Sequence, residues 1–133
     1  MRVFLSSAGT RLAQLTCVPS AVPVAVVMTS FEPGGTERQM IELVRRLDPA
    51  RWEVHLACFH AEGAWFSRAA ERVVSVAEFP VQSFMRADIL RHVWNFASWC
   101  RKRRIAVVHS TEIYSNIFAL PAAALAKIGR AHV

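Results

Sequence analysis

The feature that most constrains the fold is an unbroken apolar run at residues 23–28, with the sequence PVAVVM. An apolar run without alternating polar residues is typical of a strand that is buried on both faces, as in a parallel sheet covered by helices. The Gly34-Gly35 pair follows, and residues 40–47 then place apolar side chains at helical spacing. This order of strand, glycine turn and helix predicts the start of a βαβ unit.

The rest of the chain continues the same alternation of strands and helices. We predict a strand at 52–59, a helical turn at 64–71, a weaker strand at 73–76, a long helix at 86–103, a strand at 105–109, a helix at 115–127 and the opening of another strand at 131–133. The pattern predicts a Rossmann-like α/β domain, an open parallel sheet with helices on both faces. The strands near Val24, Val54 and Val107 should be neighbours.

Two local predictions concern the helices. Thr36 and Gln39 have the spacing of a capping box, which would begin the first helix. In the long helix, Trp94 lies beside the apolar positions Leu90 and Val93, so we expect its ring to pack in the core.

The chain divides into two predicted parts. Residues 1–21 are expected to form a flexible N-terminal arm, and residues 22–133 a single Rossmann-like domain. With 133 residues and 53% hydrophobic content, the chain can bury one core. The pattern stops at the opening of a strand, so we expect a truncated domain.

Charge and cysteine content narrow the classes of partner and compartment. The net charge of +6 favours anionic partners. Three widely spaced cysteines, Cys17, Cys58 and Cys100, indicate neither a disulfide framework nor a zinc site, so a reducing cytosol is predicted. The longest apolar stretches, 21–28 and 117–126, are shorter than the roughly 20 residues that span a bilayer, so we predict no integral membrane domain.

The loop Gly34-Gly35-Thr36 is a candidate anion site, because backbone N–H groups and the helix dipole can receive a phosphate there. The alternative is a turn that needs glycine for a positive φ. The loop matches neither a dinucleotide fingerprint nor a Walker loop. A dehydrogenase is disfavoured because the second strand ends at residues 58–60 (CFH), with only Glu62 nearby to bind a ribose.

A second polar segment, His109-Ser110-Thr111-Glu112, comes directly after the apolar strand residues 105–108. It should reach the same edge of the sheet as the glycine loop. We predict His109 as a hydrogen-bond donor or base, Glu112 as a base or hydroxyl anchor, and Asn116 as a polar contact. The alternative is that these residues only cap the strand and the next helix. No histidine or cysteine spacing indicates a metal.

The long helix carries a basic face with Trp94 and Trp99 interleaved. Cations at its carboxyl end suit the helix dipole, but the same face could contact anionic lipid or nucleic acid. The basic residues are Arg86, Arg91, Arg101, Lys102, Arg103 and Arg104.

Three motifs in this order resemble one family: residues 33–38 (PGGTER), 47–54 (LDPARWEV) and 107–112 (VVHSTE), followed by Asn116. Together they resemble the amino-terminal, acceptor-side domain of the retaining GT-B glycosyltransferases, family 4-like, over residues 22–133. The resemblance implies half of a GT-B fold, with a second, donor-binding domain absent from this sequence. The fragment alone is therefore expected to be inactive.

The resemblance also implies a function. It is that of a metal-independent hexosyltransferase without a cofactor, which moves a sugar from a nucleotide-sugar donor to a lipid, saccharide or other acceptor. Gly34 and Gly35 would approach the donor diphosphate. Thr111 stands where the family commonly has a second histidine near the transferred sugar, which leaves His109 as the only histidine of the motif. The predicted location is cytoplasmic, with peripheral contact at the inner membrane face.

The competing function is a non-catalytic Rossmann-like module that binds nucleic acid or a membrane surface through the basic helix. Salt-dependent affinity for duplex DNA or RNA would indicate it. With the glycosyltransferase function, no specific nucleic acid partner is expected.

Overall fold

The computed structural model describes residues 20–82, 87–128 and 130–132. Within these ranges, five strands form one sheet in the order β3-β2-β1-β4-β5, and every strand pairs parallel with its neighbours. Nearly all of the expected arm at 1–21 lies outside the described residues, as do Cys17, Arg86 and Val133.

Strands and helices alternate along the chain, which confirms the predicted α/β class. In order they are β1 (Val22–Met28), α2 (Gly35–Arg46), β2 (Trp52–Cys58), α3 (Phe66–Ala70), β3 (Ser75–Glu78), α4 (Ala87–Lys102), β4 (Val107–Ser110), α5 (Ile113–Leu125) and β5 (Arg130–His132). The strands near Val24, Val54 and Val107 are neighbours, as predicted, because β1 lies between β2 and β4.

The register of the sheet brings three loops to one edge. β1 pairs with β2 from Val22 opposite Trp52 to Met28 opposite Cys58, and Val27 of β1 lies opposite Ser110 of β4. Because the strands are parallel, their carboxyl ends meet on one side of the sheet, which we call the carboxyl edge. The loops after β1, β2 and β4 therefore leave the sheet there, where open α/β folds place their ligands.

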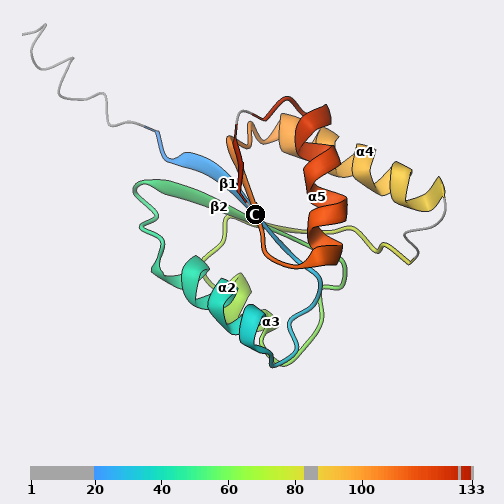
Figure 1. Cartoon of the computed structure of the whole chain (residues 1–133). Helices are drawn as coiled ribbons and strands as arrows, with labels where there is room; N and C mark the ends of the chain where they lie inside the picture. The colour runs from blue at the N-terminus through green and yellow to red at the C-terminus, as the bar shows by residue number, and fades with distance from the viewer. Residues whose placement is uncertain (1–19, 83–86, 129, 133) are drawn as a thin grey trace, which may run out of the picture.

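Helices cover both faces of the sheet, with α2 and α3 on one side and α4 and α5 on the other (Figure 1). Side chains along β1 alternate between the two layers: Val24 and Val26 pack toward α2, whereas Ala25 and Val27 pack toward α4 and α5. The unbroken apolar run in the sequence thus serves two cores at once.

The core under α4 and α5 is aromatic. Phe96 stacks on Phe118 with ring centroids 5.0 Å apart, and Phe79 meets Phe96 edge-on at 5.3 Å. These contacts fix α4 against α5. Among the described helices, none has the length and apolar character needed to cross a membrane.

Two helix predictions are wrong. The N-cap of α2 is Gly34, with no side-chain hydrogen bond, because the helix begins at Gly35 and takes Thr36 and Gln39 into its first turns. Trp94 is 59% exposed and Leu90 70% exposed, so neither packs in the core. The buried face of α4 is turned away from them and consists of His92, Val93, Phe96, Ala97 and Cys100.

Element boundaries also differ from the prediction. β3 starts two residues later than expected, at Ser75, because the N–H of Val74 donates to the carbonyl of Val54 at 2.8 Å and sets the register. α5 starts earlier than expected, at Ile113, and contains Pro121.

Candidate functional site

The loop between β1 and α2 places the first N–H groups of the helix at the carboxyl edge. Gly34 is the N-cap in an extended conformation, and the N–H of Arg38 donates to its carbonyl at 3.0 Å to close the first turn. The N–H groups of Gly35, Thr36 and Glu37 therefore have no acceptor within the helix. Together with the positive end of the helix dipole, they can receive an anion.

The two glycines differ in what surrounds them. A Cβ built on Gly35 would meet no protein atom within 4 Å, whereas one on Gly34 would collide with the carboxylate of Glu37. Gly34 has a φ of −147°, and Gly35 is not among the described residues with positive φ. The interpretation of this loop as a positive-φ turn is therefore wrong. Glycine at position 35 leaves the space beside the start of the helix open.

The connection from β2 to α3 holds the glycine loop in place. Gly63 has a φ of +125°, and a Cβ there would lie 2.6 Å from the carbonyl carbon of Phe31. The N–H of Trp65 donates to the carbonyl oxygen of Phe31 at 3.0 Å. The Phe31 ring is fully buried and meets Phe66 at 5.1 Å. Glycine is thus required at position 63, where two loops touch backbone to backbone.

Glu112 joins the loop after β4 to the glycine loop. It is the half-buried N-cap of α5, and its N–H donates to Ser115 Oγ at 3.2 Å. The hydroxyl of Thr29, the first residue after β1, donates to Glu112 Oε2 at 2.5 Å. The Glu112 carboxyl also shares a hydrogen bond with that of Glu37, in the first turn of α2. The carboxyl ends of two strands and the start of α2 therefore converge on one carboxyl pair.

These neighbours alter the pKa of the Glu112 carboxyl. Burial raises its pKa above the ordinary value, and the neighbouring Glu37 carboxyl raises it further, while the Thr29 hydroxyl acts in the opposite direction. Glu112 therefore keeps its proton to higher pH than an ordinary glutamate does. A protonated carboxyl can donate a hydrogen bond through its O–H and accept one through its other oxygen.

The other two predicted contact residues, Thr111 and Asn116, lie at the same carboxyl edge of the sheet. Ser110, buried at the end of β4, donates to Asn116 Oδ1 at 2.6 Å, which ties α5 to the strand. Thr111 follows β4 and is exposed. Next to them is a cavity of about 250 Å³, lined by Thr29, Ser30, Phe59, His60 and Tyr114.

His109 lies elsewhere. It is part of β4, where it is opposite Val26, as the predicted strand at 105–109 implies, and the expectation that it joins the glycine loop at the carboxyl edge is wrong. Its side chain lines a cavity of about 300 Å³ on the α2 face of the sheet, together with Leu43 and Leu47. Leu43 is about 9 Å along α2 from Glu37 at a rise of 1.5 Å per residue. The structure therefore brings Gly34, Gly35 and Glu112 together and leaves His109 apart.

A comparison with protein families identifies the domain. A family model described as Glycosyltransferase Family 4 matches residues 33–133, from the glycine loop to beyond α5. The chain belongs to glycosyltransferase family 4. This confirms the family resemblance of the sequence motifs. Among curated proteins, none matches the chain.

Three residues of this candidate site were not predicted from the sequence. Thr29 directly follows the first strand, a position that could have been predicted to reach the carboxyl edge. Glu37 stands in the PGGTER motif, but its contact with Glu112 depends on a separation of 75 positions that no local pattern reveals. Tyr114 reaches the 250 Å³ cavity because α5 starts two residues earlier than predicted.

The basic residues at the carboxyl end of α4 lie in a different layer from α2. The guanidinium of Arg101 lies over the Trp94 ring at 5.5 Å, and that of Arg103 over Trp99 at 5.3 Å. Both arginines belong to α4 or follow it directly, and both are exposed. The basic face is thus carried by the layer opposite α2.

Few of the described residues could act as a nucleophile or bind a metal. Burial raises the pKa of both Cys58 and Cys100 to about 12, so these free thiols stay protonated. Within the described part of the chain, no three histidine, cysteine or acidic side chains gather as a metal site would require. The predicted absence of a metal requirement stays a prediction.

Proposed function

We propose that this domain forms the diphosphate-facing wall of a glycosyltransferase that moves a hexose from a nucleotide-sugar donor to a lipid or saccharide acceptor. The observation that carries the proposal is the start of α2, where the N-cap Gly34 has no side-chain cap hydrogen bond and Gly35 faces open space. The family match supplies the reaction class. The retaining GT-B arrangement, with most nucleotide contacts in a second domain, belongs to the same proposal.

The leaving diphosphate is the group that this loop suits. Its negative charge grows as the sugar departs, and N–H donors fixed at a helix start are already oriented toward it. The proposal needs no metal, because the helix dipole and the N–H groups of Gly35 and Thr36 provide the stabilising charge. A side chain at position 35 would keep the phosphate away from these donors.

We assign the contact with the reacting hydroxyls to Glu112 in place of His109. Glu112 lies beside the start of α2 and keeps a proton to higher pH than an ordinary glutamate, so it can hold a sugar or acceptor hydroxyl. Thr111 and Asn116 flank it at the carboxyl edge and provide further polar contacts. His109, under the second half of α2, then has a supporting role in the sheet.

The proposed acceptor side includes an anionic membrane surface. Trp94 and Leu90 project from α4 into solvent, and Arg101 lies against the Trp94 ring. Exposed apolar and aromatic side chains with cations beside them are typical of a helix that binds at a membrane surface. A peripheral location at the cytoplasmic membrane face follows from this proposal. The competing non-catalytic module is not favoured by the family match.

The test compares Gly35→Val with Gly35→Ala in the full-length enzyme. Both side chains enter space that holds no protein atom, so the melting temperature should not fall in either variant. Valine should raise the KM for the donor about tenfold or more, the loss expected for one hydrogen bond to a charged group. Alanine, being smaller, should have less effect. Normal donor use by a folded Gly35→Val enzyme would refute the proposal.

A further inference from the structure

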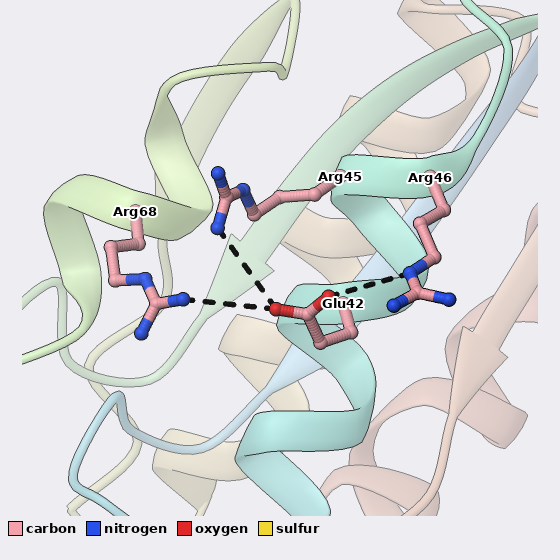
Figure 2. Close-up of polar contacts among 4 residues, drawn as sticks. All are labelled: Glu42, Arg45, Arg46 and Arg68. Carbon is pink, nitrogen blue, oxygen red and sulfur yellow. Dashed lines mark ion pairs between the residues drawn. The ribbon is translucent and has the colours of Figure 1, made fainter.

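A cluster of arginines outside the carboxyl-edge site surrounds a single glutamate. Glu42, on the outer side of α2, lies 3.9 Å from Arg45, 3.4 Å from Arg46 and 3.7 Å from Arg68 (Figure 2). Arg45 and Arg46 belong to the same helix, whereas Arg68 reaches across from α3. One carboxylate thus faces three guanidiniums.

A small cavity opens directly beside this cluster. It has a volume of about 150 Å³ and is lined by Arg38, Ile41, Glu42, Trp65 and Arg68. Ile41 is buried and Trp65 half-buried, so the cavity has an apolar base and an aromatic wall under a charged rim. None of these residues belongs to the Glu37–Glu112 pair or lines the cavity beside Thr29.

The charges of the cluster do not balance. Arg45, Arg46 and Arg68 pair with the single carboxylate of Glu42, and Arg38 lines the same cavity, which leaves a net charge of +3. The ion pairs are 3.4–3.9 Å long and partly exposed, and pairs of that kind contribute little to stability. Each guanidinium also carries five N–H donors. The cluster therefore has more positive charge and more N–H donors than are needed to hold α3 against α2.

We propose that this cavity binds the phosphate group of a phosphate monoester, with Arg38 and Arg68 as the contacting residues. A dianion matches the excess positive charge better than a carboxylate does, and guanidinium forks suit phosphate oxygens. At about 150 Å³, the cavity has room for a phosphate group. The organic part of the ligand then lies against the Trp65 ring.

This site is separate from the donor loop. The donor diphosphate is proposed to meet backbone N–H groups at the start of α2, whereas this cavity is lined by side chains of α2 and α3 and by Trp65. The inference does not depend on the proposed donor site, because loss of binding at Gly35 would leave Arg38 and Arg68 unchanged.

The experiment titrates the purified protein with inorganic phosphate and with phenyl phosphate, using calorimetry and the NMR signals of the arginine side chains. Phenyl phosphate should bind more tightly than inorganic phosphate, and Trp65→Leu should remove most of that difference. Arg38→Gln and Arg68→Gln should each weaken binding about tenfold or more. Binding should also weaken below about pH 6, where a phosphate monoester takes up a proton.

Two further variants separate a built site from diffuse attraction. Arg46→Gln removes the same charge from a side chain that is 81% exposed and does not line the cavity, so it should change the dissociation constant less than threefold. Glu42→Gln should tighten binding, because it removes the competing carboxylate. Equal weakening by Arg46→Gln and Arg68→Gln would overturn the proposal, as would shifts confined to the Gly35 and Thr36 amides.

Discussion

Replacing Gly63 by alanine should destabilise the loop that carries the candidate donor site. The residue has a φ of +125°, and its Cβ would lie 2.6 Å from the Phe31 carbonyl carbon and 2.8 Å from the carbonyl oxygen. Backbone strain in such a glycine-favoured conformation costs roughly 1–3 kcal/mol. Overpacking against rigid backbone costs about 1–3 kcal/mol more. The expected loss is therefore about 2–6 kcal/mol.

That loss is a large share of the roughly 5–15 kcal/mol that stabilises an ordinary domain. At about 4–8 °C per kcal/mol for a small domain, the melting temperature should fall by about 8 °C or more. The assay is thermal unfolding followed by circular dichroism. Hydrogen exchange of the amides at residues 31–36 should also accelerate, because Phe31 loses its close contact with the β2–α3 connection.

Gly35→Ala is the matched control. Its Cβ meets no atom within 4 Å, and position 35 is the first residue of α2. Alanine there restricts the unfolded chain and should stabilise by about 0.4–1 kcal/mol. The two glycine variants should thus shift the melting temperature in opposite directions. A Gly63→Ala protein within about 0.5 kcal/mol of the wild type would show that the two loops are not in contact.

Three further predictions concern charge. The folded-state pKa of Glu112 is raised, so the protonated carboxyl stabilises the fold at acid pH, and this stabilisation is lost as pH rises through that pKa. Glu112→Gln should therefore raise the melting temperature at neutral pH. Below about pH 4 the melting temperatures of the variant and the wild type should converge. Burial lowers the pKa of His55, so stability should fall as pH drops below about 6.5 in urea titrations, and His55→Gln should flatten that dependence. Trp94→Ser, or charge reversal at Arg101 and Arg104, should abolish co-sedimentation with anionic vesicles, and binding that ignores anionic lipid would contradict the membrane proposal.

The sequence predicted the layers of the fold because they depend on local periodicity. An apolar run such as residues 23–28 is typical of a strand covered on both faces, and the alternation with helices then leaves few topologies. The prediction that β1, β2 and β4 are neighbours is confirmed. Boundaries were less predictable, because the start of β3 depends on the Val74 hydrogen bond to another strand.

Side-chain orientation was the harder problem. Trp94 neighbours apolar residues in the sequence, yet the buried stripe of α4 turns it into solvent. His109 lies one residue before the end of β4, and this small shift sends its ring to the α2 face. The Glu37–Glu112 contact joins residues that only the tertiary fold brings together. Local patterns thus predicted the carboxyl edge and Glu112, but not Thr29 and Glu37, the side chains that contact Glu112 there.

The central claim is that the start of α2 holds the donor diphosphate. The most direct measurement is an NMR titration of the 133-residue chain with a panel of nucleotide sugars, following its backbone amide signals. We expect the largest shifts at the amides of Gly35, Thr36 and Glu37. The affinity should be on the order of millimolar, because one loop offers only a few hydrogen bonds. Saturable binding that leaves these three amides unshifted would contradict the claim, and micromolar binding with turnover would show that the chain needs no second domain.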